Sequence, residues 1–347
     1  MKKIIKRVFL ALAIIICILI IAILAFVFFG GGTLITPIPK KDHYELVVDA
    51  KYLPKLAVDG NLIIDETGRK VSLEGLMVTE LQRLSTKKNF SKEYFEEVFS
   101  CGGNVIRIPI HPESWLSDEY YLWRYLDPVV TWAIENEKYI ILDLHFIGNI
   151  INGSGSEMQD VGENPLEFSK DFWHLVASYF SDVPNAIFEI YNEPASINAK
   201  DWTASAEELI STIRRTGAKQ LILVSGIDYS YDLSCWENVT ILDENIAYVA
   251  HVFPNRYGWE QNLKKISEER PVVVTEWGYI SEKEYAKQSY LIGSREEYGK
   301  PFYDFMTENN IGWVACWYDD VWEPQIFRPQ TKELMDWGEF ALEILKD

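Results

Sequence analysis

The chain has 347 residues, 48% of them hydrophobic and 14% aromatic, which is enough apolar material for a large folded core and excludes disorder over most of its length. The formal net charge of −19 argues against nucleic acids and polyanionic substrates as partners and favours a neutral one. The four cysteines (Cys17, Cys101, Cys235 and Cys316) include no C-x-x-C pair, so we expect neither a disulfide framework nor a zinc site.

The first patterned segment is an apolar run over residues 8–29, which follows MKKIIKR and precedes any further charge until Lys40. An apolar helix needs about 20 residues to cross a bilayer, so this run predicts a transmembrane helix. The basic residues before it place residues 1–7 in the cytoplasm and the remainder of the chain outside the cell membrane. A cleavable signal peptide is the alternative, but the run is long and its exit (FFGGGTLITP) lacks an A-x-A site. We therefore expect a single-pass protein held in the lipid bilayer by residues 8–29.

Residues 30–55, which contain three consecutive glycines and three prolines, are predicted to be a linker. One folded domain is expected over residues 56–347. It opens with short hairpins at the turn signals Asp59–Gly60 and Thr67–Gly68. Apolar runs then alternate with helix-length stretches such as SKEYFEEVFS and EEYGKPFYDFMTENN. The predicted strands are residues 72–78, 104–109, 139–145, 186–191, 220–225, 246–252, 271–275 and 312–317.

This alternation predicts an α/β fold of a particular kind. Near-continuously apolar strands separated by helices are typical of parallel strands that are buried on both faces. Eight such units over residues 56–347 predict a closed (β/α)8 TIM barrel, preceded by the hairpin and the transmembrane helix. An open, doubly wound sheet is the alternative, but no G-x-G-x-x-G follows the first strand. In a barrel, functional side chains gather at the C-terminal ends of the strands.

Polar or aromatic side chains stand at the C-terminal ends of six of the eight predicted strands. Glu193 ends the fourth strand (FEIYNEP) and Glu276 ends the seventh (VVVTEWGY). Glycoside hydrolysis requires two facing carboxyl groups, one protonated and one ionised, and partial burial raises the pKa of one of them. Glu189 lies deeper and is interpreted as a paired core carboxylate. The other strand-end candidates are Arg107, His111, Asp143, His145, Asn192, His251 and Trp317.

Several of these residue types suit particular tasks around a sugar. A cation such as Arg107 lowers the pKa of a neighbouring carboxyl group and would keep it ionised. Asn192 can donate a hydrogen bond to a sugar hydroxyl. Trp277, Trp317 and Trp322 offer flat apolar faces for the C–H surfaces of sugars. His111 is interpreted either as a substrate contact or as a turn residue.

The order of these residues resembles glycoside hydrolase family 5, the cellulase and mannanase family. IYNEP ends the fourth strand and VTEWG ends the seventh, and Arg107, two strand-end histidines and Trp317 occupy the second, third, sixth and eighth strands. The resemblance covers about residues 56–347. It implies that Glu193 is the acid/base and Glu276 the nucleophile of a retaining double displacement, with Arg107 orienting the nucleophile. It also implies supporting roles for His145 and His251, sugar binding by Asn192, and a subsite floor at Trp317.

One position departs from the family pattern. The family usually has a tyrosine two residues after the histidine of the sixth strand, where it donates a hydrogen bond to the nucleophile, and this chain has Phe253. Tyr257, Tyr279 and Tyr318 are the candidates for a replacement donor.

The function expected is that of a membrane-anchored retaining glycosidase that cleaves a neutral β-linked polysaccharide, like an endo-β-1,4-glucanase, without a cofactor or metal. A β-mannanase or a glycolipid-directed glycosidase is the alternative on the same fold. A non-catalytic carbohydrate-binding barrel is the alternative from another class, as is a metal-dependent barrel hydrolase, although no H-x-H occurs. The loops 147–164 and 322–327 are expected to line subsites, but the sequence identifies neither the glycan, nor endo or exo action, nor the oligomeric state.

Overall fold

The computed structural model describes residues 38–155, 161, 164–237, 239 and 241–346, so the predicted transmembrane helix at 8–29 lies outside the described residues. No helix among these described residues is both long and apolar enough to cross a membrane. The chain divides into two units, Met1–Lys40 and Lys41–Asp347, and the fold below is that of the second. Part of the predicted linker belongs to this fold, because Tyr44 is buried and its backbone N–H donates to the backbone carbonyl of Tyr179 at 2.9 Å.

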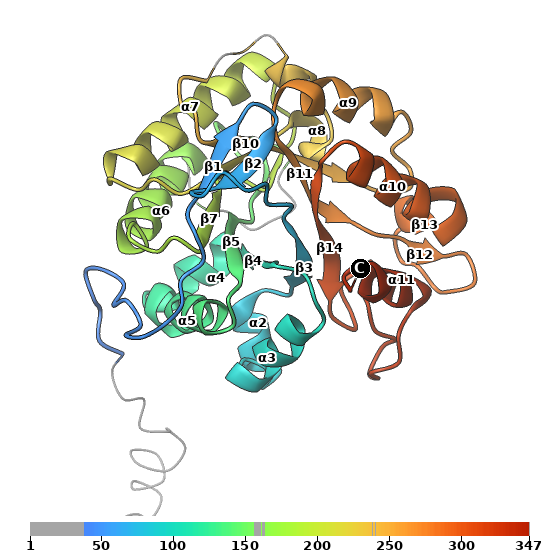
Figure 1. Ribbon diagram of the computed structural model, residues 1–347, viewed down its shortest axis with the longest axis horizontal. Coiled ribbons are helices and arrows are strands. Elements are labelled where there is room, and N and C mark those ends of the chain that lie inside the picture. Colours follow the sequence, from blue (N-terminus) through green and yellow to red (C-terminus); the bar gives the residue numbers. More distant parts are fainter. Residues whose placement is uncertain (1–37, 156–160, 162–163, 238, 240, 347) are drawn as a thin grey trace, which may run out of the picture. The chain divides into compact units, whose positions relative to one another are not determined.

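Eight parallel strands form a closed barrel in the order β10–β11–β14–β3–β4–β5–β7–β9, with β14 beside β3 (Figure 1). The predicted barrel is therefore confirmed, and each predicted strand matches an observed one to within two residues at either end. The barrel strands are β3 (Glu74–Val78), β4 (Val105–Ile110), β5 (Tyr139–Leu144), β7 (Ala186–Glu189), β9 (Ile222–Ser225), β10 (Ile246–Val252), β11 (Val272–Trp277) and β14 (Gly312–Tyr318).

Helices surround this barrel (Figure 1). The helix α7 shows why they form where they do. The side chain of Asn198 caps its first turn, Trp202, Leu209 and Ile213 lie on its buried face, and two arginines occupy its last turn. The α-helices are α2 (Leu81–Thr86), α3 (Lys92–Ser100), α4 (Pro112–Ser117), α5 (Asp127–Glu135), α6 (Pro165–Tyr179), α7 (Ala199–Arg215), α9 (Trp259–Glu269), α10 (Lys300–Glu308) and α11 (Asp336–Ile344), and α8 (Ile227–Ser230) is a single turn with left-handed residues.

Short elements complete the fold. The antiparallel hairpin of β1 (Leu56–Asp59) and β2 (Leu62–Asp65) confirms the predicted turn at Asp59–Gly60. Two parallel pairs lie outside the barrel sheet, β6 (Ile147–Gly148) with β8 (Glu193–Pro194) and β12 (Ile280–Ser281) with β13 (Ile292–Gly293). The remaining turns are the π-helical η1 (Leu122–Leu126) and η4 (Arg295–Gly299) and the 3₁₀-helical η2 (Ser234–Trp236) and η3 (Ser289–Leu291).

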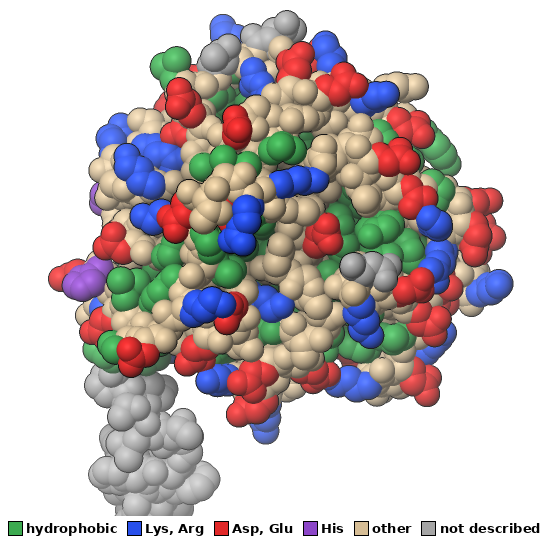
Figure 2. Space-filling model, in the orientation of Figure 1, with side chains coloured by type: hydrophobic (Ala, Val, Ile, Leu, Met, Phe, Trp, Pro, Cys, Tyr) green, Lys and Arg blue, Asp and Glu red, His purple; other side chains and the backbone are tan. Residues whose placement is uncertain are grey.

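The hairpin β1–β2 covers the N-terminal end of the barrel and lies in front of the strands in Figure 1. Its Leu56 and Ile63 are buried in the same apolar cluster as Met77 and Ile141 of the barrel strands. Acidic and basic side chains are interspersed over this face of the molecule (Figure 2). Since this end is covered by an apolar contact, access to the barrel interior lies at the opposite, C-terminal end of the strands.

Candidate active site

Arg107, on β4, is the centre of a polar cluster inside the barrel. Its side chain is fully buried, and its Nε and Nη2 donate to the two oxygens of Glu189 at 2.7 and 2.9 Å. Nη1 donates to Oε1 of Glu276 at 2.7 Å, and Nη2 lies 3.0 Å from Oδ2 of Asp143 and 2.7 Å from Oδ1 of Asn192. Because the guanidinium is a rigid planar fork, it fixes side chains from three other strands relative to one another. The interpretation of Glu189 as a paired core carboxylate is confirmed.

Glu276, at the end of β11, is held as an anion. Burial by itself would raise the pKa of Glu276, but the positive charges of His251 and Arg107 hold it below its ordinary value. One oxygen is bound by Arg107, while the other, Oε2, lies 3.8 Å from Nδ1 of His251. A buried, ionised carboxylate with one oxygen fixed and the other facing the site is suited to nucleophilic attack.

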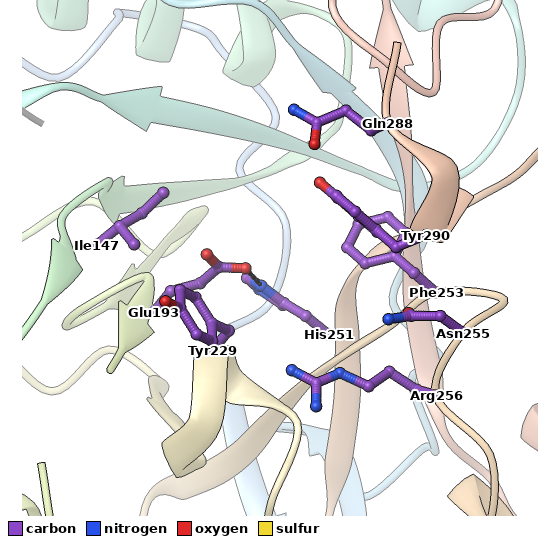
Figure 3. A pocket seen from close by; sticks show the side chains of 9 residues that line it. All are labelled: Ile147, Glu193, Tyr229, His251, Phe253, Asn255, Arg256, Gln288 and Tyr290. Carbon is purple, nitrogen blue, oxygen red and sulfur yellow. Dashed lines mark hydrogen bonds and ion pairs between the residues drawn. The ribbon is translucent and has the colours of Figure 1, made fainter. Parts of the chain in front are cut away.

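The pKa of Glu193, in β8, is shifted in the opposite direction. Burial raises the pKa of Glu193, although its hydrogen bond to His251 acts in the other direction. Its carboxyl group lines a cavity of about 290 Å³ (Figure 3), so a proton that it carries can be delivered to a bound molecule. The two glutamates therefore differ in their surroundings in the way that acid and nucleophile roles require.

His251, at the end of β10, connects the two glutamates. Its Nδ1 lies 2.8 Å from Oε1 of Glu193, and its Nε2 lies 3.0 Å from the hydroxyl of Thr275. That hydroxyl donates its only proton to Glu189, so Nε2 must donate to it. Burial opposes a charge on His251, but the surrounding carboxylates raise its pKa to about 10. His251 is therefore protonated at both ring nitrogens, and Nδ1 donates to Oε1 of Glu193.

Glu193, His251 and Glu276 also supply donor atoms that lie within 4.8 Å of one another and could hold a metal ion. A metal would need a neutral imidazole. The raised pKa of His251 and the guanidinium 2.7 Å from Glu276 both oppose this. The arrangement favours proton transfer over metal binding.

Aromatic rings form the opposite wall of the site. His145 bonds to Asp143 at 2.6 Å and stacks on His111, with ring centroids 4.8 Å apart. His111 in turn stacks on Trp322 at 5.4 Å, and Trp317 meets His145 edge-on at 5.9 Å. Burial lowers the pKa of His145 to about 3, so this ring is neutral. A second cavity of about 250 Å³ is lined by Trp317, Trp322 and their neighbours.

Nine of the ten residues predicted for the site thus lie around these two cavities or in the Arg107 cluster, and Trp277 does not. Its side chain is fully buried and packs against Trp313 and Trp337 at 5.5 and 4.9 Å. The interpretation of Trp277 as a sugar platform is wrong. Side chains alternate along a strand, so the residue after the inward-pointing Glu276 points outward to the helix layer. The residues brought together are Arg107, His111, His145, Asn192, Glu193, His251, Glu276, Trp317 and Trp322.

Sequence reasoning missed five residues that line the 290 Å³ cavity: Tyr229, Asn255, Arg256, Gln288 and Tyr290 (Figure 3). Tyr229 follows β9, one of the two strands for which no strand-end residue was identified, so the strand-end rule could have found it. Asp228, Tyr229 and Ser230 all have φ between 54° and 59°, a left-handed run that is unfavourable for residues other than glycine. An ion pair from Arg256 to Asp228 at 2.7 Å and a hydrogen bond from Ser230 to the carbonyl of Asn192 hold it in place.

None of the three tyrosines that are candidates for a replacement donor bonds to Glu276 in the described part of the chain. The hydroxyl of Tyr279 donates to Asp336 at 2.7 Å and that of Tyr318 donates to Glu97 at 2.9 Å, while Tyr257 is 89% exposed. None of these three tyrosines therefore replaces the missing donor.

The model of the cellulase family, glycosyl hydrolase family 5, matches residues 64–320. An endoglucanase of Clostridium saccharobutylicum is 26% identical over 273 residues, which cover 75% of this chain and 56% of that protein. Endoglucanase A of Butyrivibrio fibrisolvens is 27% identical over 247 residues, which cover 66% of this chain and 53% of that protein. The chain spans about half the length of these two relatives.

Solved structures share the fold over most of the chain. A β-glucanase of Saccharophagus degradans superposes with a TM-score of 0.82 and 25% identity, covering 89% of this chain and 98% of that one. The catalytic domain of an endoglucanase of Thermobifida fusca superposes with a TM-score of 0.70 and 20% identity, covering 84% and 97%. The Saccharophagus degradans enzyme has also been solved in complex with cellotetraose.

Proposed function

The chain belongs to the cellulase family, glycosyl hydrolase family 5, and on that premise we propose that it hydrolyses a β-1,4-linked glucan by a retaining double displacement. Glu276 is the nucleophile and Glu193 the acid/base. The observation that carries the proposal is the carboxyl pair itself, with oxygens within 4.8 Å of each other and pKa values shifted in opposite directions. Retaining glycosidases place these groups about 5–5.5 Å apart, whereas inverting ones need about 6.5–9.5 Å to admit a water molecule.

In the first step, protonated Glu193 donates its proton to the glycosidic oxygen. The free oxygen of Glu276, Oε2, attacks the anomeric carbon as the bond from that carbon to the glycosidic oxygen breaks. A glycosyl ester of Glu276 and a shortened glycan with a new hydroxyl group result. Arg107 keeps its hydrogen bond to Oε1, so the attacking carboxylate is oriented throughout.

In the second step, ionised Glu193 takes a proton from a water molecule that enters from the side the leaving sugar has vacated. The water oxygen bonds to the anomeric carbon, the ester bond breaks, and Glu276 returns to its carboxylate form. Two inversions at one carbon give net retention. The hydrogen bond from His251 stabilises Glu193 while it is ionised.

Asn192 is placed to bind the reacting sugar. Its Oδ1 accepts from Arg107, which leaves the amide Nδ2 as the group that can donate to a ligand. This Nδ2 is buried and has no hydrogen-bond partner among the described residues. A buried donor without a partner is unfavourable, so a sugar hydroxyl that accepts from Nδ2 relieves that cost on binding.

The test is incubation of the folded protein with cellulose oligosaccharides, mixed-linkage glucan, xyloglucan, mannan and a glycolipid. We expect hydrolysis of the β-1,4-glucans, and we expect proton NMR to detect the β anomer as the first product. First appearance of the α anomer would contradict the double displacement. A preference for mannan or glycolipid would leave the proposed mechanism unchanged but identify a different substrate. Binding without hydrolysis would favour the non-catalytic barrel.

Replacement of Arg107 by lysine tests the role of the hydrogen bonds that Arg107 donates. Lysine keeps the positive charge but lacks the planar guanidinium group, so hydrogen bonds to several carboxylates are lost. We expect the free energy of unfolding to fall by about 2–3 kcal/mol. Because the hydrogen bond from Arg107 is one of the interactions that lower the pKa of Glu276, its loss should raise that pKa and move the acidic limb of kcat/KM to higher pH. Urea unfolding and a pH–rate profile measure the two effects. Arg69→Lys, whose side chain is 74% exposed, is the control and should change neither.

We also propose that residues 8–29 anchor the chain in the cell membrane, with residues 1–7 cytoplasmic and the barrel outside. The support is the apolar run and the basic residues before it. Membrane fractionation of the full chain beside a variant lacking residues 8–29 tests this, and recovery of both in the soluble fraction would contradict it.

A further inference from the structure

Two residues connect the two cavities of the site. The 290 Å³ cavity contains Glu193 and His251, and the 250 Å³ cavity contains Trp317 and Trp322. Gln288 and Tyr290 line both, and no other residue in the described part of the chain does so. Figure 3 shows the amide of Gln288 and the hydroxyl of Tyr290 directed toward the side of the cavity where Glu193 lies. A glycan chain that passes from one cavity to the other must therefore pass these two polar groups.

Gln288 and Tyr290 lie in the loop of residues 282–291, which is held in place by strand pairing and by apolar packing. The parallel pairing of β12 with β13 joins its two ends. Beneath it, Leu291 packs with Ile280 and Met335, and Phe253 and Ala286 pack against this cluster. The ring of Phe253 also meets that of Tyr290 edge-on, with centroids 5.8 Å apart. Phe253 thus supports this loop through apolar contacts.

Glu323, in the loop after β14, holds the middle of the same loop. Its Oε1 and Oε2 accept from the backbone N–H of Lys287 at 2.9 and 3.0 Å, and Oε2 also accepts from the backbone N–H of Gln288 at 3.2 Å. Hydrogen bonds to a carboxylate are about twice as strong as those between neutral groups. This contact fixes the backbone immediately before the side chains that line both cavities.

We propose that Gln288 and Tyr290 are specificity-determining residues, which select the glycosidic bond that lies over Glu193 and Glu276, and that Glu323 is the positioning residue that holds them. The inference rests on the proposed function, because it requires a glycan that occupies both cavities. A chain of identical sugars can bind in several registers, and hydrogen bonds at the junction of the cavities favour one register over its neighbours. Loss of one such bond changes the ratio of two registers by about fivefold.

The experiment uses a β-1,4-linked glucose oligosaccharide labelled at its reducing end, so that the ratio of labelled products reports which bond is cut. Tyr290→Phe removes only the hydroxyl, and we expect it to change this ratio by about fivefold. Tyr285→Phe is the matched control, since Tyr285 lies in the same loop, is 80% exposed and lines neither cavity. The ratio for Tyr285→Phe should equal that of the wild type.

Glu323→Ala should also shift the product ratio, and Glu323→Gln, which keeps an oxygen acceptor, should restore part of it. Amide hydrogen exchange at Lys287 and Gln288 should be faster in Glu323→Ala, and this readout does not depend on activity. Unchanged ratios in Tyr290→Phe and Glu323→Ala would overturn the assignment of specificity, and unchanged exchange would overturn that of Glu323. If the wild type cleaves no glucan, the proposed function fails together with the specificity role, while the exchange result still decides whether Glu323 holds the loop.

Discussion

Glu276→Ala is expected to lower kcat by at least about 10⁴-fold, because it removes the atom that, in the proposed double displacement, bonds to the anomeric carbon. The vacated space lies beside Arg107 and His251, whose positive charges remain and attract small anions. Added azide should therefore attack the anomeric carbon in place of the carboxylate and partly restore turnover. Only one displacement then occurs, so the product is a glycosyl azide of inverted, α configuration. Initial rates with and without azide, and NMR of the product, measure both effects.

Glu260→Ala is a suitable control for Glu276→Ala, because Glu260 is an exposed glutamate in the first turn of α9. This variant should retain wild-type rates and gain nothing from azide. Rescue of Glu276→Ala that yields the β-azide would show that another group still forms the covalent bond, and the assignment of Glu276 would be wrong.

Glu193→Ala is expected to slow hydrolysis by about 10²–10⁴-fold when the leaving group is a sugar, since that is the usual worth of general acid catalysis. When the leaving group is an acidic phenol, it can leave without protonation. Aryl glycosides of such phenols should therefore lose far less rate in their first step. In the proposed mechanism Glu193 acts while protonated, so activity should fall as pH rises through its pKa, which burial raises. The alkaline limb of kcat/KM should therefore disappear in the variant while the acidic limb, set by Glu276, remains.

A series of aryl glycosides assayed across pH measures these effects, and Glu193→Gln provides a second variant that retains a hydrogen-bonding side chain next to His251. Equal losses on good and poor leaving groups, or an alkaline limb that persists, would contradict the role of Glu193. Azide added to Glu193→Ala should give the β-glycosyl azide, opposite in configuration to the product from Glu276→Ala.

The barrel could be predicted because its strands are buried on both faces, so that each is a short, nearly continuous apolar run. The C-terminal ends of parallel strands share one rim, so position at a strand end was enough to bring Arg107, Glu193, His251 and Glu276 together. The prediction that Trp277 binds sugar was wrong because a position near a strand end does not determine which way the side chain points. The alternation of side-chain directions along β11 determines this, with Glu276 pointing inward and Trp277 outward.

The loop residues of the site could not be predicted in the same way, because contacts far away in sequence determine their positions. Tyr229 depends on an ion pair between Asp228 and Arg256, and Gln288 depends on Glu323, 35 residues further along. The predicted linker shows the same difficulty at Tyr44, which is buried against residues more than 80 positions away. No local pattern distinguishes a loop that packs in this way from one that does not.

The closeness of the two carboxyl groups has a consequence for the timing of the proton transfers. The negative charge of Glu276 contributes to the raised pKa of Glu193. In the proposed double displacement this charge is gone once Glu276 is esterified by the sugar, while Arg107 and the protons on His251 remain nearby. The pKa of Glu193 must then fall, and the group that has just given up a proton becomes a base able to accept one from water. Hydrolysis of the ester restores the charge on Glu276 and, with it, the raised pKa that lets Glu193 be protonated again for the next substrate. Each half of the proposed cycle thus prepares the protonation state that the other half needs.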